Sequence, residues 1–232
     1  MGADFLMLVV ALAAFVGTHF LMSHPWRKPL VRSLGEKSFQ AVYSLVSIVT
    51  LGFTIVAFQR NAPAPMLWNG KAVVPWTLAS VLTYIATALF LASLTGNPAL
   101  PGARIAGLSA ILPKGVYRIT RHPMMWAFAL ISVAHILVAP TPRTIALSVA
   151  VIVLALGGSH LQDRKKDKLH GRDWRSWLKR TTFWPDVRQA GKLGYYWIIA
   201  LLPWLLVTAA HLVTAHEYAG IWKPIHEMRH PD

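Results

Sequence analysis

The chain has 232 residues, of which 55% are apolar and only 14% are charged, which excludes both a soluble globular protein and a disordered chain. Its 23 Lys and Arg residues against 9 Asp and Glu residues give a formal charge of +14. The chain has no cysteine, which excludes disulfides, thiolate nucleophiles and cysteine-ligated metals. Any metal must therefore be held by histidine.

Six uncharged stretches lie at about 5–22, 41–58, 74–95, 124–139, 144–158 and 195–215. A helix needs roughly 20 apolar residues to cross about 30 Å of hydrocarbon, so four stretches are long enough to span. The stretches at 124–139 and 144–158 are short, and Pro140 and Pro142 between them predict an antiparallel hairpin. We therefore expect an all-α integral membrane bundle of about six transmembrane helices, forming a single domain over 1–232.

The basic residues fall in alternate loops, as expected of a membrane protein whose cytoplasmic loops collect positive charge. Loops 23–40, 96–123 and 159–194 together hold 18 of the 23 Lys and Arg residues. This pattern predicts a bacterial-type inner-membrane protein with these loops inside and with both termini, including the tail 216–232, outside. Because the charges are split between loops and mixed with acidic residues, we expect no nucleic-acid partner.

The most basic segment, 161–185, also carries apolar side chains. Leu169, Trp174, Trp177 and Leu178 can enter the headgroup layer while neighbouring Lys and Arg residues meet anionic lipid. The sequence therefore predicts an interfacial segment at 161–185, within a cytoplasmic region 161–194, with membrane lipid as its partner.

The six stretches contain no Asp or Glu, so histidines are the candidate functional groups within the bilayer. Two histidines on separate apolar helices suit haem better than zinc or calcium, because imidazole is a common axial donor and haem prefers apolar walls. By depth along the helices, at about 1.5 Å per residue, His19 pairs better with His122, and His135 pairs better with His211. Each histidine could instead simply bond a neighbouring helix.

Two motifs, GTHFLMS at 17–23 and GVYRITRHPMMWAFALISVAHIL at 115–137, resemble the NnrU family of membrane proteins and, more distantly, the plant zeta-carotene isomerases that share this domain. The resemblance covers about residues 5–160. It implies a haem b site with His19 and His135 as metal ligands and His122 as a further cofactor-binding residue. Ser132 stands where the plant enzymes have a cysteine.

The resemblance also implies a function. NnrU proteins are associated with nitrite and nitric oxide respiration, which implies a denitrification-supporting role. The plant enzymes imply an isomerase-like, haem-dependent cis–trans reaction on a lipid-soluble small molecule such as a polyene. Arg118 and Arg121, three residues apart, could hold a haem propionate or another cofactor carboxylate, or contact lipid phosphate.

Two alternatives remain open. GVYRITRHP, followed by KKDKLHGRDWRSWLKRTTFWP, is similar to the isoprenylcysteine and phospholipid methyltransferases, which implies S-adenosylmethionine bound at Arg121 and His122. In place of that group's acidic pair and two tail tyrosines, the chain has Lys165-Lys166-Asp167, Trp174 and Trp177. The other alternative is a non-enzymatic accessory or assembly factor for respiratory complexes.

Overall fold

The computed structural model describes residues 2–62, 64–100, 103, 105–215 and 219–224. Throughout these residues the chain forms helices, turns and loops, with no strand. The predicted all-α class is therefore confirmed. The predicted outer tail lies largely outside the described residues, because 216–218 and 225–232 are not among them.

Five described helical segments are long and apolar enough to cross a membrane, which agrees with the predicted membrane bundle. They are α1 (Ala3–Ser23), α3 (Glu36–Arg60), α4 (Val73–Ser93), the segment Pro142–His170 and the segment Tyr196–Val213. The last is made of α9 (Tyr196–Ile199) and the start of α10 (Leu201–Ala215). The sixth predicted helix, α5 (Pro123–Val138), is also present but has only 16 residues. Much of the apolar surface of these helices is exposed, as lipid-facing helices require.

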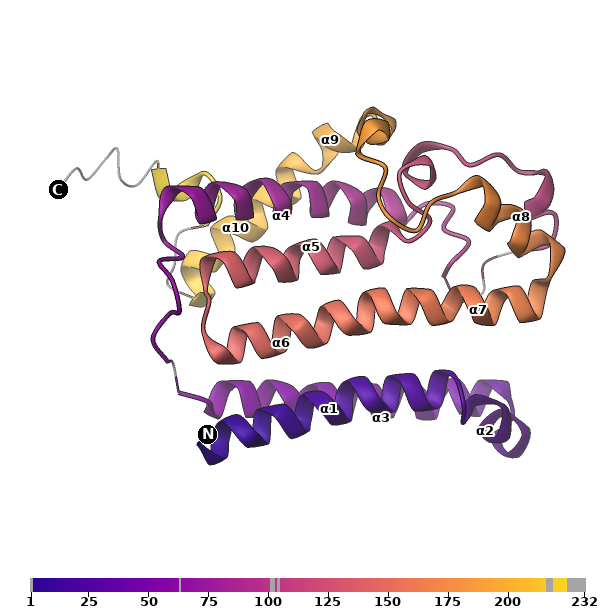
Figure 1. The fold of residues 1–232 in the computed structure, drawn as a ribbon, viewed down its shortest axis with the longest axis horizontal. Helices are drawn as coiled ribbons and strands as arrows, with labels where there is room; N and C mark the ends of the chain where they lie inside the picture. Colours follow the sequence, from indigo (N-terminus) through magenta and orange to yellow (C-terminus); the bar gives the residue numbers. More distant parts are fainter. Residues whose placement is uncertain (1, 63, 101–102, 104, 216–218, 225–232) are drawn as a thin grey trace.

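The helices form two groups with a long helix between them (Figure 1). On one side α1 and α3 pack together, and Leu8, Ala11, Leu12 and Ala57 form their shared core. On the other side α4 and α5 pack together, with α10 alongside. The segment Pro142–His170 runs between the two groups, so its side chains can meet residues from both.

The predicted hairpin of 124–139 and 144–158 is present, but its second arm is much longer than expected. Its first arm is short, but its second arm continues through α6 (Pro142–Ile152), a π-helical turn η3 (Val153–Gly157) and α7 (Gly158–His170) for 29 residues. Thr141 caps the start by accepting a hydrogen bond from the Thr144 N–H, and the helix continues through Gly157 and Gly158 to end before Gly171, which has a φ of +48°. Residues 161–170 therefore belong to the long helix.

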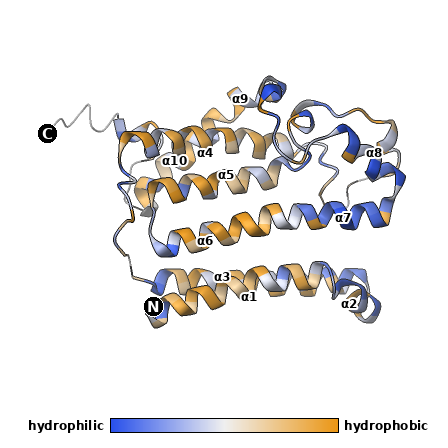
Figure 2. Cartoon of the chain, in the orientation of Figure 1, coloured by the Kyte–Doolittle hydropathy of each residue, from blue (hydrophilic) through white to orange (hydrophobic). Residues whose placement is uncertain are grey.

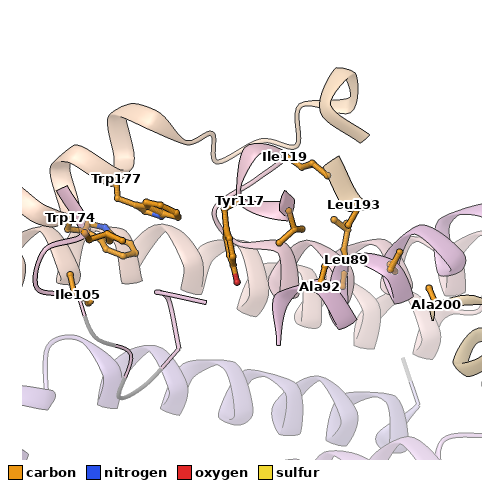
Figure 3. Close-up of a cluster of buried hydrophobic side chains, with 14 residues drawn as sticks. Leu89, Ala92, Ile105, Tyr117, Ile119, Trp174, Trp177, Leu193 and Ala200 are labelled. Carbon is orange, nitrogen blue, oxygen red and sulfur yellow. The ribbon is translucent and has the colours of Figure 1, made fainter. Parts of the chain in front are cut away.

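The second half of the predicted interfacial segment packs its tryptophans against the protein instead of inserting them into the headgroup layer. Residues 172–180 form α8 (Arg172–Arg180), in which Trp174 and Trp177 are 0% and 3% exposed. Figure 3 shows both rings packed within the protein, in a cluster with Ile105 and Tyr117. Asp173 of α8 accepts hydrogen bonds from the N–H groups of Gly107 and Ser109, which hold the loop over the helix. The prediction that these tryptophans enter the headgroups was therefore wrong.

Hydrophilic residues gather at one end of the molecule, at α7, α8 and the short α2 (Arg27–Leu34), which the sequence did not predict (Figure 2). The loop between α4 and α5 lies at this same end (Figure 1). The three basic loops thus share one end, which we call the basic end. The turn between α5 and α6 lies at the other, which we call the distal end. That the basic end faces the cytoplasm stays a prediction.

Candidate functional site

The two basic motifs that the sequence separates by about sixty residues are joined by hydrogen bonds at the basic end. The segment 119–122 leads into α5, and the segment 181–186 follows α8. The shortest of the bonds that connect them are Arg121 N–H to Thr182 O (2.9 Å), Thr120 Oγ1 to Phe183 O (2.7 Å), Thr182 Oγ1 to Ile119 O (2.9 Å) and Asp186 N–H to Ile119 O (2.9 Å). The backbone before α5 is therefore held in a fixed position, which orients Arg121 and His122.

Arg121 and His122 share one carboxylate, that of Asp163 on α7. The Arg121 Nε atom lies 2.7 Å from Asp163 Oδ2, and His122 Nε2 lies 2.9 Å from Asp163 Oδ1. The His122 and Asp163 side chains are 1% and 8% exposed. Hydrogen bonds between charged groups are the strongest in proteins, and a buried charge requires such partners. This network ties α5 to the central helix.

The other ring nitrogen of His122, Nδ1, is buried and has no hydrogen-bond partner among the residues that the structure describes. His122 lines a cavity of about 120 Å³ together with Met124, Met125 and Gln162. The remaining lining residues are Asn97, Ala99 and Leu100, from the loop after α4. A residue with an unpartnered ring nitrogen thus lines a space that a small group can fill.

A larger cavity of about 710 Å³ shares two lining residues, Asn97 and Leu100, with the small one. Its walls include Tyr117 and Trp177, whose ring centroids are 5.9 Å apart. Burial raises the pKa of Tyr117 far above its usual range, and the charge on Tyr196 adds to this effect. The Tyr117 hydroxyl therefore stays protonated and donates to the Thr95 carbonyl at 2.9 Å. The cavity is large enough for an apolar molecule with a flat ring.

His135 and His211 meet at the distal end. Their ring centroids are 6.3 Å apart, with 35° between the ring planes. In each ring Nδ1 lies 2.8 Å from the carbonyl four residues earlier, that of Ile131 or Val207. The Nδ1 proton is thereby held on that nitrogen, which leaves Nε2 as a free acceptor or ligand. This pairing agrees with the depth estimate from the sequence.

His19 lies elsewhere. It occupies the last turns of α1, towards the basic end, where its Nδ1 is 2.8 Å from the Phe15 carbonyl and its ring contacts Tyr43 edge-on at 5.4 Å. Because α1 ends at the basic end and α5 ends at the distal end, His19 and His135 lie near opposite ends of the bundle (Figure 1). The structure therefore does not bring together the two histidines that the resemblance names as ligands.

Two further expectations concern charged residues. Arg118 is exposed on the short helix η2 (Gly115–Arg118), whereas Arg121 already binds a carboxylate, that of Asp163. Asp163 itself was missed, because it lies beyond the uncharged stretches and 41 residues from His122. In the sequence, Asp163 could have been suspected only because it lies three residues after His160, near the end of a long helix. Within the described part of the chain, no three His, Cys, Asp or Glu side chains cluster as a metal site.

The fold and these side chains define a class: an all-helical membrane protein with a buried Arg–Asp–His network at one end and an imidazole pair at the other. The sequence matches the NnrU protein family over residues 7–231, so the chain belongs to that family. It is also 28% identical over 182 residues to the chloroplastic 15-cis-zeta-carotene isomerase of Arabidopsis thaliana, covering 76% of this chain and 50% of that protein. The chain thus spans about half the length of this relative. No solved structure matches the chain.

Proposed function

We propose that this NnrU-family protein binds haem b through membrane-embedded histidines and performs an isomerase-type, cis–trans reaction on a lipid-soluble polyene. The observation that carries the proposal is the imidazole pair of His135 and His211. The similarity to a plant zeta-carotene isomerase supports the substrate class. Orientation with the basic end in the cytoplasm of a bacterial-type inner membrane is part of the same proposal.

The imidazole pair supplies the kind of donors that a haem b site needs, two imidazoles on separate helices with ring centroids 6.3 Å apart. His135 is exposed, and among the described residues only its Nδ1 atom has a hydrogen-bond partner. An exposed imidazole on an apolar helix is costly in a bilayer, so a bound group would remove this cost.

The second ligand distinguishes two versions of the proposal. The family resemblance favours His19 beside His135, whereas the distance and the Nδ1 hydrogen bonds favour His211. In both versions His135 is a ligand, and the Ile131 carbonyl orients its ring. Haem, when bound, would supply an iron that exchanges one electron and acts as a Lewis acid. The protein would supply the apolar enclosure and the ring orientation.

The first experiment is an absorption spectrum of the detergent-purified protein, oxidised and then reduced, with haem supplied during expression. We expect a Soret band that His135→Ala abolishes. His211→Ala and His19→Ala then identify the second ligand, and His160→Ala, an exposed position on α7, is the matched control. The absence of a Soret band in the unaltered protein would refute the haem proposal.

The isomerase role is tested separately. The haem-loaded protein is incubated, oxidised or reduced, with a poly-cis carotene, and the isomers are separated by chromatography. We expect conversion in one redox state only, and none with His135→Ala. If a protein with an intact Soret band leaves the isomer ratio unchanged in both states, the polyene substrate is wrong while haem binding stands.

A further inference from the structure

We propose that the cavity beside His122 is a second binding site, one that recognises the hydroxyl group of a membrane-soluble hydroquinone. In this site the Nδ1 atom of His122 accepts a hydrogen bond from the hydroxyl, and the apolar ring and tail of the ligand extend into the larger cavity. The site lies at the basic end and does not depend on haem binding at His135.

The first step is the identity of the free group. A carboxylate only accepts hydrogen bonds, so the 2.9 Å contact between His122 Nε2 and Asp163 Oδ1 places a proton on Nε2. Arg121 donates to the other oxygen of the same carboxylate. When the imidazole is neutral, its Nδ1 carries a lone pair, and the ring then presents a hydrogen-bond acceptor. The matching group on a ligand is a donor.

The second step is the cost of leaving that acceptor unfilled. His122 is 2% exposed, and its Nδ1 has no partner in the described part of the chain. Buried polar atoms without partners are rare in native proteins because they lose their bonds to water. The cavity of about 120 Å³ is several times larger than the roughly 30 Å³ that one water molecule occupies. It can accept a larger group than a single water.

The third step is the chemistry of the other lining residues. The Asn97 and Gln162 side chains already bond the backbone of Ala99, at 2.9 and 2.8 Å, and the remaining lining is largely apolar. Each amide thus uses one polar atom to bond the backbone, and His122 Nδ1 is the fully buried polar side-chain atom of this lining that lacks a partner among the described residues. A ligand with one hydroxyl and an apolar body matches this arrangement better than an ion or a sugar does.

The fourth step is the shape of the ligand. The larger cavity of about 710 Å³ has flat aromatic walls, Tyr117 and Trp177, which favour a planar ring. Figure 3 shows these two rings side by side. A phenolic hydroxyl is a stronger donor than an aliphatic one, and the carboxylate behind His122 strengthens the imidazole as an acceptor. A hydroquinone with an apolar tail combines these features.

The test is a calorimetric titration of the full chain in detergent with two probes: a decyl-substituted hydroquinone, kept reduced, and its dimethyl ether. The ether has the same ring and tail but no donor. We expect the hydroquinone to bind roughly 10- to 100-fold more tightly, the range for one hydrogen bond of this kind. Equal affinity for the two probes, or binding of neither, would overturn the proposal.

The variant Asp163→Asn separates recognition from a merely structural role. Its amide can donate to His122 Nε2, which moves the imidazole proton to Nδ1 and converts the acceptor into a donor. We expect the preference for the hydroquinone over the ether to disappear and the corresponding quinone, which only accepts, to bind more tightly. An unchanged preference in a folded Asp163→Asn protein would contradict the inference.

If Asp163→Asn does not fold, Ala99→Leu provides the second measurement, because the longer side chain fills part of the small cavity. We expect it to weaken hydroquinone binding by at least tenfold, while His160→Ala has no effect. Unaltered binding by Ala99→Leu would place the ligand elsewhere. A Soret spectrum of the same samples reports the distal end, so failure here and failure of the haem proposal are distinguished.

Discussion

The two ends of the bundle use histidine in different ways. At the basic end His122 is buried, and its contacts are long-range: Asp163 is 41 residues away, and the backbone before it is bonded to residues 182–183. At the distal end His135 and His211 bond only the carbonyls four residues earlier in their own helices, and they face each other. The first arrangement joins distant segments of the fold through Nε2 of His122, whereas the second joins no two elements by a hydrogen bond.

The loss of unfolding free energy on removing the partner of a histidine should therefore be larger at the basic end than at the distal end. A buried charge whose partner is lost remains unpaired, because water does not reach it. An imidazole bonded to its own helix loses little when a neighbour changes. Stability measurements can therefore test which end holds the fold together.

The largest expected effect is that of Asp163→Ala, which leaves the Arg121 guanidinium unpaired and removes the acceptor of His122. We expect a loss of about 3–5 kcal/mol in the free energy of unfolding. Unfolding in mixed detergent micelles, followed by circular dichroism, measures it. His211→Ala at the distal end is the control, and equal losses for the two variants would contradict the distinction between the ends.

The next effect tests a tightly packed point of the distal end. A Cβ atom on Gly70 would lie 2.2 Å from the carbonyl oxygen of Val138, at the end of α5. Gly70→Ala should therefore push the loop away from the helix and cost about 1–3 kcal/mol. The same unfolding assay applies, with Gly52→Ala, which has nothing nearby, as the control. A neutral Gly70→Ala would show that this loop moves freely.

A smaller effect is expected from Thr120→Val at the basic end. The Thr120 hydroxyl is buried and donates to the Phe183 carbonyl at 2.7 Å. That carbonyl keeps a second donor, Trp126 Nε1 at 2.8 Å, so it does not become unsatisfied. We expect a loss of about 1 kcal/mol in unfolding free energy. A loss as large as that of Asp163→Ala would mean that the hydroxyl orients the whole network.

The smallest effect is expected from Arg175→Ala, which breaks the pair with Asp167. The two side chains are 66% and 40% exposed, and their contact is 2.9 Å. Exposed ion pairs contribute little because solvent screens them, so we expect a change within about 0.5 kcal/mol. If Arg175→Ala destabilises the protein more than Thr120→Val does, burial does not explain the expected difference between the Arg175–Asp167 and Arg121–Asp163 ion pairs.

The sequence predicted the class, the positions of the six apolar helices and the gathering of the basic loops, because these follow from hydropathy and charge along the chain. It could not predict the burial of Trp174, because the same alternation of basic and aromatic residues suits a membrane surface and a covered helix equally. The loop around Gly107 and Ser109 packs over α8, because both N–H groups donate hydrogen bonds to Asp173. These segments are distant in the sequence.

The candidate site was predicted only in part. His122 and Arg121 were found from their motif, but their shared partner Asp163 and the buried Nδ1 follow only from tertiary packing. His211 was found by depth along the helices, because rise per residue is a local property. The assignment of His19 with His135 relied on resemblance and stays a prediction.

The π-helical turn at Val153–Gly157 explains why Asp163 points where it does. Such a turn fits one additional residue into the helix, so every residue after it is rotated by roughly 100° relative to a regular α-helix. With an uninterrupted α-helical repeat, a neighbour such as Gln162 or Arg164 would take the direction that Asp163 occupies. The wider turn therefore determines which side chain reaches Arg121 and His122. Deleting one residue from this turn would rotate Asp163 away from them and bring a residue without a carboxylate into its place.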